Sequence, residues 1–161
     1  MFKQRYEAFA VEYPHLASEL FTEIDLFNPV DTETYIKTLA LWDTGATISS
    51  IAPGLLKKLC LEPVDSIIIE GINSLEKCDQ VLVHVGLPNR IIVPNIKPSM
   101  CNFGPPNLEF IIGMDIIKYC AFMIANDRGK TLFSFAVPPL PMKINLVNQA
   151  EHINRNGEKG Q

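Results

Sequence analysis

The sequence predicts an all-β fold with short helices, and three observations support this prediction. Apolar and polar residues alternate over residues 20–27, which is typical of a strand with one buried face. Many other short apolar segments are separated by Gly, Pro, Asn and Asp, the residues that favour tight turns. One apolar segment ends directly in Asp43-Thr44-Gly45-Ala46, which places an acid in a tight turn after a buried strand.

The chain begins with a segment whose apolar residues recur at helical spacing. Pro14 follows and would end a helix, so we expect an N-terminal amphipathic helix within an extension that covers residues 1–19. The apolar residues of this pattern are Phe2, Tyr6, Phe9, Ala10 and Tyr13.

A single domain is expected at residues 20–142. Its first strands, 20–27 and 34–42, flank a turn at Asn28-Pro29-Val30-Asp31. Pro53 begins a short helix, because Pro is favoured in the first helical turn and apolar residues follow at helical spacing. The remaining expected elements are strands at 47–51, 66–70, 76–87, 91–96 and 108–112, an irregular loop at 98–107, a short helix at 115–119, and a hairpin of strands 121–126 and 131–137.

The end of the chain differs in composition. Pro138, Pro139 and Pro141 end the globular pattern. Residues 143–161 form a C-terminal tail that finishes in Asn, Gly, Glu and Lys, so we expect the tail to be partly disordered.

Composition narrows the classes of function. The 161 residues are 47% hydrophobic and 20% charged, as in an ordinary globular domain that can bury a core. The net charge of −4 gives no basic surface, so no nucleic-acid partner is expected. No apolar run reaches the length of a membrane span, so no membrane partner is expected either. Charged residues interrupt the apolar pattern of the N-terminal segment, unlike the continuous apolar segment of a secretory signal.

The cysteines and histidines indicate neither a metal centre nor a nucleophilic site. Cys60, Cys78, Cys101 and Cys120 form no Cys-x-x-Cys pair, and no histidine stands close enough in sequence to complete a metal site. The three histidines are scattered along the chain. We therefore expect no metal, no cofactor, reduced thiols and a cytoplasmic location.

A second segment accompanies the Asp43 turn. Downstream, Phe110-Ile111-Ile112-Gly113-Met114-Asp115 places apolar residues before a glycine, and Gly113 follows Asp43 by 113 − 43 = 70 residues. Together the two segments resemble the retropepsin-like aspartic peptidases, in which an Asp-Thr/Ser-Gly-Ala turn is cradled by a later hydrophobic-hydrophobic-Gly strand that crosses behind it. The resemblance covers about residues 20–137 and implies one retroviral-type protease lobe.

The resemblance implies an aspartic endopeptidase. Hydrolysis of a peptide bond by such an enzyme needs two carboxylates that share one proton and activate a water. Because the chain has one Asp-Thr-Gly, the second Asp43 must come from another copy. A symmetric homodimer that acts on a peptide or protein substrate is therefore expected.

The resemblance also assigns roles around the turn. The Thr44 hydroxyl makes a hydrogen bond to the backbone across the dimer axis. Gly45 lets the backbone approach the carboxylate, and Ala46 keeps the turn small. Thr47 either braces the turn through a local hydrogen bond or is an ordinary strand threonine. Gly113 allows the crossing strand to pack close behind the turn.

Two neighbouring side chains carry separate expectations. The indole N–H of Trp42 needs a hydrogen-bond partner if this residue is buried. Asp115 is expected to be the N-cap of the short helix that contains Ile116.

Ile69, Glu70, Gly71 and Ile72 lie where the resemblance places the substrate-covering flap. Such flaps are glycine-rich, whereas this segment has one glycine. Glu70 either faces the cleft and favours basic substrate side chains or is a solvated carboxylate. The unusual flap supports a rival interpretation, in which the chain is a non-catalytic module of the same fold that dimerises or binds peptides.

Overall fold

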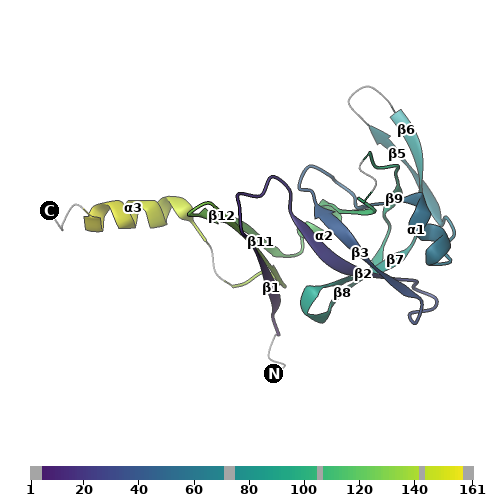
Figure 1. Cartoon of the computed structure of the whole chain (residues 1–161), viewed down its shortest axis with the longest axis horizontal. Helices are drawn as coiled ribbons and strands as arrows, with labels where there is room; N and C mark the ends of the chain where they lie inside the picture. Colours follow the sequence, from purple (N-terminus) through teal and green to yellow (C-terminus); the bar gives the residue numbers. More distant parts are fainter. Residues whose placement is uncertain (1–4, 71–74, 105–106, 142–143, 158–161) are drawn as a thin grey trace.

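The computed structural model describes residues 5–70, 75–104, 107–141 and 144–157, and within them two β-sheets form the body (Figure 1). The strands of the larger sheet are β2 (Phe21–Phe27), β3 (Tyr35–Trp42), β4 (Ser50–Ile51), β5 (Asp65–Glu70), β6 (Leu75–Gln80), β7 (Val83–Leu87), β8 (Ile91–Ile96), β9 (Ser99–Met100) and β10 (Phe110–Ile112). Their spatial order is β5-β6-β9-β4-β10-β3-β2-β7-β8. The smaller sheet contains β1 (Glu7–Tyr13), β12 (Lys130–Val137) and β11 (Ala121–Asp127), in that order. The expected all-β fold class is confirmed.

The β2–β3 hairpin follows the alternation of its sequence. The two strands pair antiparallel from Phe21↔Leu41 to Phe27↔Tyr35. Ile24 and Leu26 of β2 point into the core and are almost completely buried, because they occupy the apolar phase of the strand. The polar phase faces outwards, and β3 ends at the Asp43 turn.

The strand β10 crosses behind the end of β3. It pairs parallel to β3, with Ile112 opposite Trp42, and antiparallel to β4 on its other side. Phe110 and Ile112 are fully buried, as expected for a short strand that is covered on both faces. The helix α2 (Met114–Ile117) follows directly, and the other short helices of the body are α1 (Pro53–Lys58) and the 3₁₀ turn η1 (Pro88–Arg90).

The prediction of an N-terminal helix is wrong, because the described part of that segment is the strand β1. It pairs antiparallel with β12 from Glu7↔Val137 to Tyr13↔Thr131. Phe9 points inwards and stacks on Phe135 with 5.4 Å between ring centroids. Phe9 and Tyr13 of the helical pattern also alternate with Val11 between them, and the aromatic residues packed under the sheet favour the strand.

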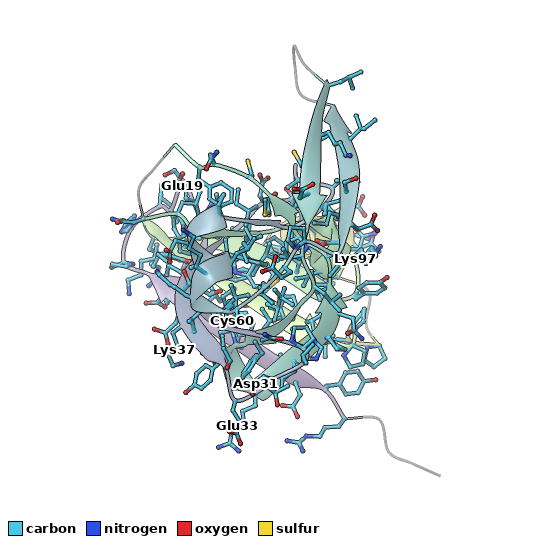
Figure 2. All side chains as sticks on the ribbon, turned by 90° about the vertical axis from the view of Figure 1, so that its right-hand side faces the viewer. Glu19, Asp31, Glu33, Lys37, Cys60 and Lys97 are labelled. Atoms are coloured by element: carbon cyan, nitrogen blue, oxygen red, sulfur yellow. The ribbon has the colours of Figure 1, made fainter. Side chains whose placement is uncertain are left out.

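Other differences lie in the middle of the chain. The expected strand at 76–87 is two strands, β6 and β7, and the expected strand at 47–51 is reduced to Ser50–Ile51. The loop at 98–107 contains the short strand β9. The tip of the expected flap, residues 71–74, lies outside the described residues, while its two strands β5 and β6 project from the body as a hairpin (Figure 2).

The C-terminal tail, which was expected to be partly disordered, contains the helix α3 (Leu146–Gly157), and its last residues, 158–161, lie outside the described ranges. Figure 1 shows this helix extending away from both sheets. Across the described ranges, no helix combines the length and apolar character that a membrane span requires.

Candidate functional site

Backbone hydrogen bonds hold the Asp43 carboxylate in its turn. The N–H of Gly45 donates to Asp43 Oδ1 at 2.8 Å, and the N–H of Ala46 donates to the Asp43 carbonyl at 3.3 Å. The Asp43 N–H donates to the Ile112 carbonyl at 3.0 Å, which fastens the turn to the crossing strand. Asp43 is half-buried, whereas Thr44 and Gly45 are exposed, so the turn presents its carboxylate at a surface.

The crossing strand approaches so closely that only glycine fits at position 113. A Cβ on Gly113 would lie 2.7 Å from the backbone carbon of Ile48 and 2.9 Å from the carbonyl oxygen of Ala46. The same Ala46 carbonyl accepts a hydrogen bond from the Met114 N–H at 2.8 Å. The expected packing behind the turn is therefore present in the geometry.

A buried serine connects the strand after the turn to α2. Asp115 Oδ1 accepts hydrogen bonds from the Ser49 N–H at 3.0 Å and from the Ser49 hydroxyl at 2.7 Å. Ser49 Oγ in turn accepts the Gly113 N–H at 3.1 Å. The predicted N-cap role of Asp115 is wrong: Gly113 is the N-cap, and Asp115 lies in the first turn of α2, where it receives Ser49 and the Ile116 N–H.

Trp42 joins the two sheets. It is 5% exposed, and its indole N–H donates to the hydroxyl of Thr22 at 2.9 Å, which meets the need for a partner. Its ring packs against Phe133 and Phe135 at centroid distances of 5.1 and 5.0 Å. Sequence reasoning missed Thr22 and Ser49, although a hydroxyl residue on the buried face of an alternating strand is a signal for such a bond.

The remaining predicted residues are more exposed or are outside the described ranges. Thr47 is exposed, and among the described residues its side chain has no hydrogen-bond partner. Ile69 and Glu70 end the strand β5, where Glu70 pairs with Leu75 through the backbone. Gly71 and Ile72 lie outside the described residues.

A cavity of about 300 Å³ lies beside the Asp43 turn. Asp43 and Thr44 line one side, and Phe122 and Ile124 of β11 line another. Since β11 is an edge strand of the smaller sheet, that edge reaches the turn. A peptide or a second protein surface could approach Asp43 there.

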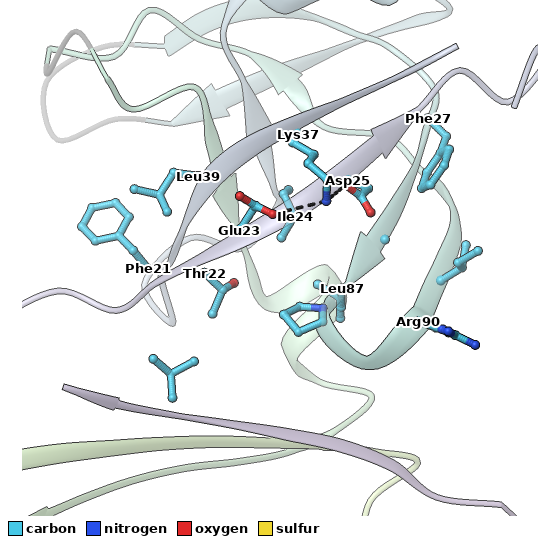
Figure 3. Close-up of a pocket in the computed structure, with 14 residues that line it drawn as sticks. Phe21, Thr22, Glu23, Ile24, Asp25, Phe27, Lys37, Leu39, Leu87 and Arg90 are labelled. Carbon is cyan, nitrogen blue, oxygen red and sulfur yellow. Dashed lines mark hydrogen bonds and ion pairs between the residues drawn. The ribbon is translucent and has the colours of Figure 1, made fainter. Parts of the chain in front are cut away.

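A larger cavity, of about 620 Å³, lies on the outer face of β2 and β3 (Figure 3). Lys37 Nζ stands 2.9 Å from Asp25 and 3.2 Å from Glu23. The hydrogen bond that Lys37 donates to Asp25, and then the one that it donates to Glu23, raise the pKa of Lys37. Asp43 does not line this cavity, and its exposed charges form a surface network, so it is separate from the Asp43 turn.

Known structures share this architecture. The crystal structure of a retropepsin-like aspartic protease from Rickettsia conorii matches 85% of this chain and 99% of its own, with a TM-score of 0.53 and 14% sequence identity. The chain has a retropepsin-like fold. The solution structure of the Simian Foamy Virus (mac) protease also matches, with a TM-score of 0.44, 17% identity, and coverage of 62% of this chain and 93% of its own. No family model matches the sequence, and no curated protein matches it.

Within the retropepsin-like fold of this chain, the turn and the crossing strand meet at one place. β3 delivers Asp43, β10 passes behind it, and α2 begins where the two touch at Ala46 and Met114. The residues that the sequence singled out at 43–46 and 113 are thus brought together, while Thr47 remains at the surface.

Proposed function

We propose that the chain is a homodimeric aspartic endopeptidase in which two Asp43 carboxylates, one from each copy, activate a water that hydrolyses a peptide bond. The observation that carries this proposal is the Asp43 turn. Its carboxylate is oriented by the Gly45 N–H, supported by β10 and half-exposed. The turn stands at a surface that a second copy can reach.

The reaction requires both carboxylates. The ionised one takes a proton from water, and the protonated one donates a hydrogen bond to the scissile carbonyl. The water oxygen then attacks the carbonyl carbon, and the tetrahedral intermediate collapses as a proton passes from the pair to the leaving amine. One lobe supplies one carboxylate, so the two-fold axis of the dimer must pass between two Asp43 turns.

The neighbouring residues support this arrangement in defined ways. The exposed Thr44 hydroxyl is available for a grip on the partner copy across the axis. Gly45 keeps Cβ atoms away from the carboxylate, since a Cβ there would stand 3.1 Å from Asp43 Oδ1. Ala46 and Gly113 provide the contact with the crossing strand. Thr47 lies beside them in an exposed bend that precedes β4.

The flap segment completes the proposed site. Ile69, Glu70, Gly71 and Ile72 would cover a bound peptide, with Glu70 either facing basic substrate side chains or remaining in solvent. The β5–β6 hairpin that carries the segment projects from the body, as a cover must (Figure 2). In the part of the chain that the structure describes, no disulfide joins the four cysteines, which supports a reducing compartment such as the cytoplasm.

Cleavage of a peptide library by the wild-type chain and by Asp43→Asn tests the proposal. Asparagine cannot accept a proton from water, so we expect cleavage to vanish in Asp43→Asn while the dimer persists. Asp127→Asn, at the exposed end of β11 beside the hairpin turn, is the matched control and should cleave at the wild-type rate. Wild-type cleavage should be strongest at acidic to near-neutral pH, because two facing carboxylates retain a shared proton there. An Asp43→Asn dimer that cleaves at the wild-type rate would disprove the mechanism.

A second candidate function is a non-catalytic module of the same fold that dimerises or binds peptides. The observation that favours it is the single glycine of the flap segment, which restricts opening and closing of the hairpin. In that case the wild-type chain binds peptides without cleaving them, and Asp43→Asn leaves the affinity almost unchanged. Isothermal titration with library peptides separates this function from the peptidase.

A further inference from the structure

The outer face of the smaller sheet is built from small side chains. The strand register places Ala8, Ala136 and Ala121 in one row across β1, β12 and β11, and Ala10, Ser134 and Met123 in the next. We call these six residues the alanine face. Large residues of the same strands, such as Phe9 and Phe135, point to the opposite side and fill the core. A face of alanines lets another element approach the strands closely.

The helix α3 carries an apolar stripe that none of the described residues of its own chain covers. Four apolar residues recur at positions i, i+1, i+4 and i+7 and so share one side of the helix: Leu146, Val147, Ala150 and Ile153. The side chains of Leu146, Val147 and Ile153 are 65–71% exposed. Burial of such a stripe, more than intrinsic propensity, stabilises a twelve-residue helix.

The apolar stripe of α3 and the alanine face lie near each other in the chain but do not pack against each other. Leu140 and Ile144, which lead into α3, line a cavity of about 400 Å³ on the alanine face together with Ala8, Ala10 and Met123. From there α3 extends away from its own sheet (Figure 1). One apolar surface therefore begins where the other ends.

We propose that α3 of one copy packs its apolar stripe across the alanine face of a second copy, and that the second copy does the same in return. The proposal rests on the homodimer of the proposed function and adds a second contact to it. A two-fold axis closes this exchange, because each copy offers one helix and one receiving face. Leu146, Val147 and Ile153 supply the large side chains that a face of small residues lacks.

Position and charge favour a second copy as the occupant. The edge strand β11 lines both surfaces: Ala121 and Met123 lie on the alanine face, whereas Phe122 and Ile124, on the opposite side of the same strand, line the cavity beside Asp43. The alanine face and the surface proposed to meet a second copy therefore share this edge strand. Glu151 and Arg155 are the Asp/Glu/Lys/Arg residues of α3, so the helix has no net charge. A helix that binds anionic membranes instead carries many basic residues on its polar side.

Sedimentation of charge variants tests the exchange from the helix side. Ala150→Glu places a carboxylate in the middle of the stripe, so we expect the dimer dissociation constant to rise by about tenfold or more. Asn148→Glu adds the same charge on the opposite side of α3 and should leave the constant unchanged. Both positions are exposed in the single chain, so neither variant endangers the fold of the monomer.

The receiving face is tested in the same way. Ala10→Glu, on the alanine face, should weaken the dimer to a similar extent, whereas Thr32→Glu, in an exposed turn, should not. Equal dissociation constants for Ala150→Glu, Ala10→Glu and their controls would overturn the proposal. If Ala150→Glu instead abolishes binding to vesicles of anionic phospholipid and leaves the dimer intact, the stripe is a membrane-binding surface and the exchange is wrong.

A cross-linking experiment distinguishes exchange from packing within one chain. Copies with photo-reactive benzoylphenylalanine in place of Ile153 are mixed with ¹⁵N-labelled copies that lack the probe. After illumination, mass spectrometry should join the light probe peptide to heavy peptides of β1, β11 or β12. Cross-links confined to light peptides would show that α3 folds onto its own sheet, against the proposal.

These outcomes are independent of catalysis. If the chain dimerises with the expected cross-links but no peptide is cleaved, the peptidase proposal fails and the exchange stands. If peptides are cleaved and Ala150→Glu dimerises normally, the exchange alone fails.

Discussion

At the scale of single residues, the site depends on one close backbone contact and on one hydrogen-bonded pair of polar side chains. Gly113 and the Ala46 carbonyl lie too near each other for any side chain between them. Ser49 and Asp115 are buried or half-buried polar groups that satisfy each other. The close contact at Gly113 could be predicted from the sequence, because a glycine follows apolar residues. The Ser49–Asp115 hydrogen bond could not, because a serine after a turn and an acid at the start of a helix are each common by themselves.

Gly113→Ala should lower the free energy of unfolding by about 1–3 kcal/mol, because its Cβ collides with backbone atoms that cannot move aside easily. Gly54→Ala is the control, since an added Cβ there meets nothing within 4 Å and the residue lies in α1. It should be neutral or stabilise by up to about 1 kcal/mol. Urea unfolding of both variants measures the difference, and equal stabilities would contradict the crossing geometry.

Ser49→Ala removes the hydroxyl that donates a hydrogen bond to Asp115 and accepts one from the Gly113 N–H. We expect a loss of about 1–3 kcal/mol in the free energy of unfolding, because the buried Gly113 N–H is left without its acceptor and Asp115 loses one of its three donors. If the chain is a peptidase, kcat should fall more than KM changes, since the turn loses a support without losing a substrate contact. Ser66→Ala, at an exposed position, should change neither quantity.

Burial raises the pKa of the Cys120 thiol to about 12. The pKa of a cysteine in an unfolded chain is about 8.5. The stability that the neutral thiol contributes is therefore present below about pH 8.5 and is lost as the pH rises towards 12. At pH 8 a thiol reagent should modify the exposed Cys60 rapidly and the half-buried Cys120 much more slowly, as mass spectrometry of the labelled chain can show. Equal labelling rates would count against the burial of Cys120.

At the scale of elements, the spacing of apolar residues predicted the secondary structure correctly where it fits one period. It failed where the same residues fit both a helix and a strand. The β2–β3 hairpin, α1, β8 and the β11–β12 hairpin all appear where the sequence placed them. In β1 the spacing of Phe9, Ala10 and Tyr13 fits a helix, but the alternation of large and small residues fits a strand that is apolar on both faces. In α3 the polar composition suggested disorder, although its apolar residues have a helical period.

The strand assignment of β1 has a measurable consequence at Phe9. Phe9→Ala should cost about 3–5 kcal/mol of unfolding free energy, because the ring is 8% exposed and packs among aromatic residues. Tyr6→Ala, at a position 37% exposed just before the strand, should cost less than about 1 kcal/mol. Thermal or urea unfolding distinguishes them. Similar small losses would mean that the segment is not docked on β12.

At the scale of the whole molecule, the proposed site exists only where two copies meet. Stability and activity should then depend on protein concentration, because association stabilises the folded state by mass action. We expect the melting temperature to rise with concentration, and the activity per mole of chain to fall on dilution below the dimer dissociation constant. Scanning calorimetry over a concentration series, with parallel peptide assays, measures both. A concentration-independent specific activity would argue against a shared site.

The parallel pairing of β3 with β10 also determines when the site forms during synthesis. The pairing joins Trp42 to Ile112, so the loop between them must be closed before either strand gains its neighbour. Non-local contacts of this kind form late and slowly, after the local hairpins. A nascent chain that has exposed the Asp43 turn to solvent still lacks the strand behind it until β10 has left the ribosome. The order of translation therefore leaves the Asp43 turn without its supporting strand until most of the domain has been made.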